Sequence, residues 1–170
     1  MHWRHKVRPS SQRARRTAAE NTEGSDAYPA PPVSYDVHHM AYRFEFDPVN
    51  KVLLARFEGR FTDEAAAEFY REIRERSTAT DASAGIWDLS SVTEFAVSGE
   101  FIRWLADQEP AMPDGARRPR ILVAPTLEGF GLARMFQIAG ESTRPLLQVV
   151  RTLDEAFAAL GVQSPQFQPL

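Results

Sequence analysis

The chain of 170 residues contains no cysteine, which excludes disulfide bonds, thiolate nucleophiles and sulfur-ligated metal sites. All four histidines precede residue 40, and Lys51, beside a predicted turn, is the only lysine after that point. A histidine general base, a histidine-ligated zinc site and a buried Schiff-base lysine therefore have no candidate in the rest of the chain. We accordingly predict no metal, no cofactor and no enzymatic activity.

Long apolar runs are also absent, so we expect no membrane insertion. The basic N-terminus is not followed by an apolar segment of the kind found in secretory signals, and we predict a cytoplasmic protein. The net charge of −3 is modest, and 170 residues are enough for one domain with a substantial core. Carboxylates, arginines and hydroxyls are the polar groups left to carry a function.

The first 39 residues differ in composition from the rest. They contain a basic run followed by the proline-rich stretch 27–32, without apolar periodicity, and we predict a disordered tail over 1–39. One interpretation is a contact arm for nucleic acid or an acidic membrane. The others are a solvated tail, or sequence that precedes a true start at Met40. Aromatic residues are not interleaved with the basic ones beyond Trp3, so we expect no nucleic-acid partner.

Residues 40–162 show alternating strand and helix patterns. A hairpin is expected from 42–47 and 52–61, because Asp47-Pro48-Val49-Asn50-Lys51 has the chemistry of a turn. Helix starts are indicated by hydroxyl caps at Thr62, Ser98 and Thr152, and a stop by Gly161. The further predicted elements are a helix to about residue 76, a strand 85–89, a loop 90–97, a helix 98–109, a strand 120–124, a helix 127–141, a strand 145–151 and a helix ending at 160.

The predicted order is ββαβαβαβα, which is typical of an α/β fold. We expect a single mixed sheet of about five strands, with an N-terminal antiparallel hairpin followed by parallel strands, and about four helices. Residues 163–170 contain two prolines and are predicted to be a flexible C-terminal tail. The carboxyl ends of the parallel strands would gather Asp88, Ser98 and Arg151 at the edge where ligands and partners usually bind.

Four stretches together carry a family resemblance: the hairpin 42–61, Trp87-Asp88-Leu89-Ser90-Ser91-Val92, Gly131-Leu132-Ala133-Arg134-Met135-Phe136, and Arg151-Thr152-Leu153-Asp154-Glu155-Ala156. In this order they resemble the STAS domain of anti-sigma-factor antagonists, and more closely the small bacterial proteins described as STAS-like or SEC14-like. The resemblance implies a non-enzymatic regulatory module that binds another protein, such as a serine kinase or an anti-sigma-type regulator. A homodimer is compatible with it.

STAS antagonists are regulated at a serine that begins the helix after the third strand, usually after an aspartate and before a glycine. Ser98-Gly99 occupies that place here, but Phe95-Ala96-Val97 precedes it and the acidic neighbour is missing. Ser98 is therefore either a plain helix cap or a phospho-acceptor as well, since a helix N-terminus favours phosphate. The predicted partner-binding residues are Asp88, Ser90, Ser91, Phe95, Ser98, Gly99, Glu100 and Arg103.

Two other functions are open. The SEC14-like description suggests a carrier of a small apolar ligand or lipid, with a pocket between the sheet and helix 127–141 formed by Phe130, Arg134 and Met135. An enzyme using Asp88, Glu100 or Arg134 has the weakest support. The stretch Gly129–Arg134 does not fit a dinucleotide fingerprint, because Arg134 stands where a small residue is needed. Glycines at this spacing more often allow close packing on a sheet.

Overall fold

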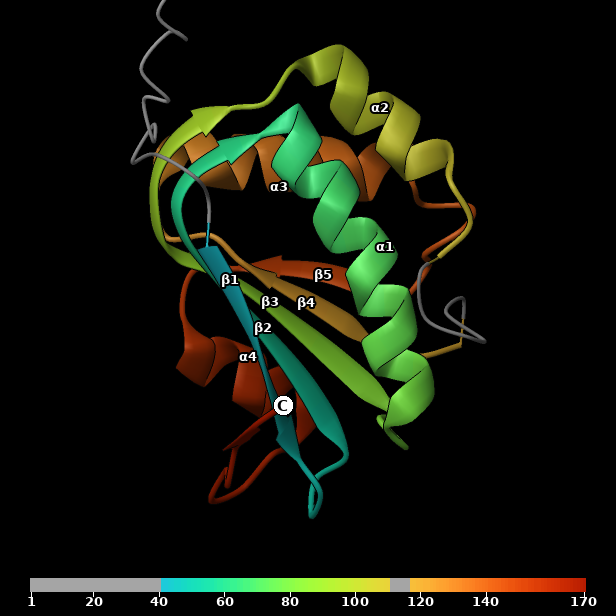
Figure 1. Ribbon diagram of the computed structural model, residues 1–170, viewed down its shortest axis with the longest axis vertical. Helices are drawn as coiled ribbons and strands as arrows, with labels where there is room; N and C mark the ends of the chain where they lie inside the picture. Colours follow the sequence, from blue (N-terminus) through green and yellow to red (C-terminus); the bar gives the residue numbers. More distant parts are fainter. Residues whose placement is uncertain (1–40, 111–116) are drawn as a thin grey trace, which may run out of the picture. The chain divides into compact units, whose positions relative to one another are not determined.

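The computed structural model describes residues 41–110 and 117–170 (Figure 1). The disordered tail predicted over 1–39 lies outside these residues. The predicted α/β architecture is confirmed, with a short sixth strand added at the end of the chain. The elements are β1 (Ala41–Asp47), β2 (Val52–Thr62), α1 (Asp63–Ala79), β3 (Ala84–Ala96), α2 (Gly99–Asp107), β4 (Arg120–Val123), α3 (Leu127–Ala139), β5 (Leu147–Val150), α4 (Leu153–Leu160) and β6 (Gln168–Pro169).

One mixed sheet runs in the order β5-β4-β3-β2-β1-β6. β1 pairs antiparallel with β2 and with β6, whereas β2, β3, β4 and β5 are mutually parallel. Each parallel strand is followed by a helix. All four helices therefore begin at the carboxyl edge of the parallel strands, where binding sites of open α/β sheets usually form.

The two faces of the sheet bury different side chains. Helices α1, α2 and α3 cover one face, and α4 covers the other (Figure 1). The first face is rich in aromatic rings, among them Phe44, Phe57, Phe69, Trp87 and Phe136. The α4 face is aliphatic, with Val52, Leu54, Ile86, Ile121 and Val123. Strand side chains alternate between the two faces, so successive residues of β2, β3 and β4 belong alternately to the aromatic core and to the aliphatic core.

Strand β3 is much longer than predicted. The sequence indicates a loop over 90–97, but β3 continues to Ala96 and stays paired with β2. Two register shifts between the strands, each with an extra residue in β3, allow this, and Gly59 of β2 lies at one of them with φ of 85°. Such bulges bend a strand, and glycine adopts a positive φ without strain. The polar residues within 90–97 look like a loop in the sequence. Their pairing partners are residues 58–62 of β2, about 30 positions earlier, so local patterns do not reveal the strand.

The C-terminal segment 163–170 is predicted to be flexible, but the structure pairs it with β1. Leu170 N–H donates to Phe44 O at 3.0 Å, and Phe167 stacks on Phe157 with ring centroids 6.0 Å apart. A second anchor is Asp47, which is fully buried and whose Oδ2 accepts the Gln166 N–H at 2.9 Å. Two prolines do not prevent this pairing, because only two residues join the sheet edge.

Asp47 is a buried acid held by its own chain. Its Oδ1 accepts the backbone N–H groups of Val49 and Asn50 at 2.9 and 3.0 Å, and its Oδ2 accepts Asn50 Nδ2 at 2.7 Å. Burial acts to raise the pKa of Asp47, but these hydrogen bonds and that from Gln166 together hold it below the ordinary 3.8. The carboxylate therefore fixes both the hairpin turn and the C-terminal segment.

Candidate functional site

A hydroxyl side chain caps each of the four helices at the carboxyl edge. Thr62, Ser98, Thr126 and Thr152 each have extended backbone and accept the N–H three residues further on, at 3.1–3.3 Å. The caps predicted at Thr62, Ser98 and Thr152 are confirmed. Such a bond satisfies one of the free N–H groups in the first turn of the helix.

Ser98 differs from the other caps because a carboxylate from another helix holds it. Asp63 begins α1, and its Oδ1 accepts the Ser98 N–H at 2.9 Å while its Oδ2 accepts the Ser98 hydroxyl at 3.1 Å. The same hydroxyl oxygen accepts the Phe101 N–H at 3.1 Å. The acidic neighbour missing from the sequence before Ser98 is thus supplied across space by α1.

Asp63 is not among the predicted site residues, because in the sequence it is only an acid in the first turn of the helix after Thr62. The pairing arises because β2 and β3 are parallel neighbours, so that α1 and α2 start side by side. Thr62 is the register partner of Ala96, two residues before Ser98. If the sequence had indicated that β3 extends to Ala96, the pairing of Thr62 with Ala96 could have been inferred. The loop predicted over 90–97 prevented this inference.

A shallow groove of about 430 Å³ surrounds this contact and is lined by Asp63, Ser98, Glu100, Phe101 and Trp104. We call these five residues the Ser98 groove. Trp104 is 50% exposed, and its ring centroid lies 5.2 Å from that of Phe101. An exposed indole next to a second aromatic ring is an unusual surface feature, since large aromatic residues are more often covered.

The predicted partner-binding residues separate into two groups. Ser98 and Glu100 line the groove, and Gly99 and Arg103 lie beside it on α2. Ser90 and Ser91 are exposed on β3, while Asp88 and Phe95 are placed elsewhere.

Asp88, predicted to bind a partner, is buried in the structure. It is 4% exposed, it projects from the α4 face of the sheet, and its Oδ2 accepts Arg56 Nη1 at 2.8 Å. Its Oδ1 accepts the Ser90 N–H at 3.0 Å. A carboxylate buried in this way fixes β3 to β2 and is not free to contact a partner. Glu100 lies on α2, which covers the other face of the sheet.

Phe95, also predicted to bind a partner, is half-buried. Its ring lies 6.0 Å from that of Phe61 and packs on α3 at Gly129. A Cβ at Gly129 would lie 2.7 Å from Phe95 Cζ, so this glycine is required for the close approach. The predicted packing role of this glycine is confirmed, and the large aromatic residue exposed near Ser98 is Trp104.

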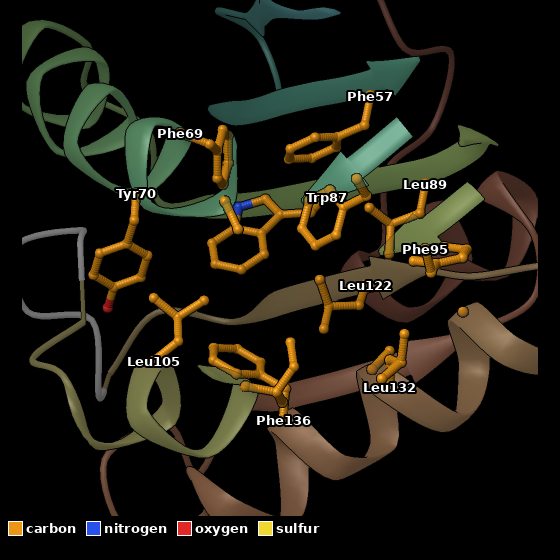
Figure 2. A pocket seen from close by; sticks show the side chains of 15 residues that line it. Phe57, Phe69, Tyr70, Trp87, Leu89, Phe95, Leu105, Leu122, Leu132 and Phe136 are labelled. Atoms are coloured by element: carbon orange, nitrogen blue, oxygen red, sulfur yellow. The ribbon is translucent and has the colours of Figure 1, made fainter. Parts of the chain in front are cut away.

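An apolar cavity of about 50 Å³ lies between the sheet and helices α1, α2 and α3. Figure 2 shows Trp87, Leu105, Leu122 and Phe136 converging on it. An apolar cavity of about 150 Å³ is needed for benzene, so a lipid chain does not fit this space. The geometry therefore does not favour the carrier hypothesis.

The three residues predicted for that pocket do not line this cavity, because they lie on other faces of α3. The Phe130 ring lies beneath the Arg151 guanidinium at 3.8 Å from its centroid. Arg134 is exposed and bonds to Gln137, and Met135 faces α2 near Gly99. The side of α3 that meets the cavity carries Leu132, Ala133 and Phe136 instead.

Within the ranges 41–110 and 117–170, no group of three or more histidine, aspartate or glutamate side chains gathers in a way that could hold a metal ion. None of the helices in those ranges is both long and apolar enough to cross a membrane.

No protein-family model matches the sequence, and a search of curated proteins finds no match. Solved structures that are similar to this chain include the anti-sigma factor antagonist SpoIIAA in its unphosphorylated form, at 12% identity and a TM-score of 0.47, covering 73% of this chain and 100% of that one. The phosphorylated form of the Bacillus cell fate determinant SpoIIAA is 18% identical, with a TM-score of 0.42 and coverage of 69% and 97%. An anti-sigma factor antagonist from Mycobacterium paratuberculosis is 17% identical, with a TM-score of 0.46 and coverage of 72% and 95%.

Proposed function

We propose that this chain is a non-enzymatic regulatory module of the STAS type, which binds another protein at the Ser98 groove and is switched by phosphorylation of Ser98. One observation carries the proposal. The Ser98 hydroxyl lies at an exposed helix N-terminus, in an open groove, and is held by a carboxylate from a second helix. The resemblance of the sequence to STAS antagonists supports a regulated serine at this position.

Phosphorylation would change the charges at this contact. A kinase would transfer the γ-phosphoryl group of ATP to Ser98 Oγ, and ADP and the hydroxyl proton would be released to solvent. The hydrogen bond that Asp63 now accepts from this hydroxyl would then be lost. The phosphate carries nearly two negative charges, and the first-turn N–H groups of α2 favour it. Asp63 and Glu100 would repel it, so the bond that joins α1 to α2 at Ser98 would be lost.

The partner would gain its contact energy from the aromatic side of the groove. Trp104 and Phe101 present apolar area beside the Ser98 hydroxyl, and buried tryptophans commonly dominate the binding energy of interfaces. A partner that closes over Trp104 would place its own charges near Asp63 and Glu100. Added phosphate would then repel any acidic group that the partner, such as an anti-sigma-type regulator, places there, and would weaken its binding. A cytoplasmic location belongs to this proposal, because the switch requires a kinase and ATP.

Quantitative co-purification from the native host tests both the docking site at the Ser98 groove and the effect of a negative charge at Ser98. We expect Trp104→Ala to reduce the recovery of a specific partner at least about tenfold, as for a central interface residue. Ser98→Asp should reduce it, and Ser98→Ala should retain it. Val49→Ala is the matched control, because Val49 is 74% exposed and lies in the β1–β2 turn away from the groove.

Mass spectrometry of the chain from its host should also detect a phosphopeptide that contains Ser98. Equal recovery of the partner by the wild type, Trp104→Ala and Ser98→Asp would refute the docking site. Absence of the phosphopeptide, together with normal Trp104 dependence, would retain the docking surface and remove the switch.

A further inference from the structure

Arg120 is a buried cation for which the described residues provide no counter-charge. It is the first residue of β4 and only 2% exposed. It shares a sheet face with Leu122, two residues on, which packs in the aromatic core. Its Nε and Nη2 have no hydrogen-bond partner among the described residues, and none of their carboxylates lies within ion-pair distance. Buried polar groups are rarely left in this condition.

The two unpaired nitrogens form one edge of the guanidinium group. Nε–H and the adjacent Nη2–H point in the same direction, at a spacing that matches two oxygens of a phosphate or carboxylate. A water molecule could satisfy a donor, but it would not compensate for the buried positive charge. The free edge of Arg120 therefore has the geometry and the charge of an oxyanion receptor.

Arg144 adds a second positive charge nearby. It is 2% exposed, and its Nη2 donates to the Tyr70 hydroxyl at 2.6 Å and to Gln108 O at 2.8 Å. These acceptors are neutral, and the Nε of Arg144 is without a partner among the described residues. Burial lowers the pKa of Arg120 to about 10, and the charge of Arg144 contributes to the same shift. Two buried cations that have no acid within the described part of the chain favour a divalent anion over a monocarboxylate.

We propose that Arg120 and Arg144 form a binding site for a small oxyanion of the phosphate class, held through the Nε and Nη2 edge of Arg120. The site lies at the amino edge of the parallel strands, at the opposite end from Ser98.

A surface depression of about 280 Å³ reaches this region between α3 and the start of β5. Arg144 and Leu147 form part of its wall, and Leu147 is the register partner of Arg120 on the neighbouring strand. Parallel register partners project side chains from the same face of a sheet, so Arg120 lies next to Leu147, although Arg120 is not itself part of the wall. Arg134 and Glu141 also line the depression and offset each other in charge. Attraction of an anion therefore depends on the buried arginines.

Thermal denaturation of the full chain with inorganic phosphate, compared with chloride at equal ionic strength, tests the proposal. We expect phosphate to raise the wild-type melting temperature by about 4 °C at a concentration ten times the dissociation constant. Arg120→Met should show no such shift. Its melting temperature in chloride should be unchanged or higher, because a buried charge is removed. Arg103→Met is the matched control, since Arg103 is exposed on α2 and should leave the phosphate shift intact.

Equilibrium dialysis with radiolabelled phosphate provides a second measurement that does not depend on the stability of a variant. Wild type should retain phosphate, and Arg120→Lys should bind it about tenfold more weakly, because lysine keeps the charge but lacks the two parallel donors. No melting shift and no retained phosphate in wild type would overturn the site. If Arg103→Met bound phosphate as weakly as Arg120→Lys, the binding would reflect unspecific attraction by positive charge, and the proposed site would be overturned too.

Asp114 is the acid closest to Arg120 along the sequence. Its replacement distinguishes a bound oxyanion from an acid of the chain itself as the counter-charge of Arg120. Phosphate binding that occurs in Asp114→Asn but not in wild type would overturn the proposal and assign the counter-charge to this chain. Binding that is equal in the two proteins would support the oxyanion site.

Discussion

At the carboxyl edge of the parallel strands, polar side chains find partners on other elements. Asp63 accepts hydrogen bonds from the backbone N–H and the hydroxyl of Ser98, and Asp88 pairs with Arg56. At the amino edge, Arg120 and Arg144 are buried without an acid among the described residues. Both edges belong to one sheet, and the same strands reach both. The polar groups of the first edge therefore satisfy one another, whereas the described residues leave guanidinium nitrogens of the second edge unsatisfied.

The amino edge also contains a buried acid, but it cannot meet the arginines. Asp47 projects from the α4 face at β1, whereas Arg120 projects from the other face at β4, with β2 and β3 between them. Backbone N–H groups satisfy Asp47 instead. The sheet therefore keeps buried charges of opposite sign apart, and among the described residues only the charge of Asp47 is compensated. The predictions below test how far this separation of the two edges holds.

Replacement of Arg144 should have the largest effect on stability. Its guanidinium donates to carbonyl groups at the C-terminal end of α2, namely those of Leu105, Ala106 and Gln108, and to Tyr70 of α1. We expect Arg144→Met to lower the free energy of unfolding by about 3 kcal/mol, because these buried acceptors lose their donor. Urea denaturation measures the change. A loss below that of Arg120→Met would contradict the assigned role.

Breaking the ion pair between Arg56 and Asp88 should have the second-largest effect on stability. Asp88→Ala leaves Arg56 with Glu45 alone and removes the acceptor for the Ser90 N–H, so we expect a loss of about 2 kcal/mol. The matched control is Glu94→Ala, which breaks the exposed pair with Arg60 and should change stability by less than about 0.5 kcal/mol. Equal losses in the two variants would show that burial does not distinguish these pairs.

Ser98 and Asp63 should show a smaller and coupled effect. Ser98→Ala should cost about 1 kcal/mol, the usual value of a helix cap, and Thr126→Ala is the matched cap that lacks an acid from another helix. Ser98→Asp places a second carboxylate beside Asp63. We expect Asp63→Asn to restore part of the stability lost in Ser98→Asp, which a double-mutant cycle would measure. Strict additivity would contradict direct contact between the two side chains.

The pH dependence of Asp47 should be the smallest effect. Its pKa in the folded chain lies below 3.8, so its contribution is present above that pH and is lost as the pH falls through the folded value. The stability difference between wild type and Asp47→Asn should therefore shrink on acidification from about pH 7 to about pH 2. Gln166→Pro removes one donor to the carboxylate and should weaken this pH dependence. A difference that is constant with pH would contradict the assigned shift.

The sequence by itself determined the local features. A hydroxyl that accepts a hydrogen bond from an N–H three residues away needs no tertiary information, so the caps at Thr62, Ser98 and Thr152 could be predicted. The alternating pattern of the strands and the glycine stop at Gly161 were predictable for the same reason. These local signals were enough for the α/β fold and for the position of the candidate regulatory serine.

Tertiary structure decided which groups meet. The carboxylate on Ser98 comes from Asp63, 35 residues earlier, and only the parallel pairing of β2 with β3 brings the two helix starts together. The same pairing extends β3 through residues that look like a loop, and an antiparallel edge holds a C-terminus that looks flexible. The burial of Arg120 is likewise set by its neighbours in space, because hydrogen-bond partners and desolvation depend on contacts that sequence distance does not reveal.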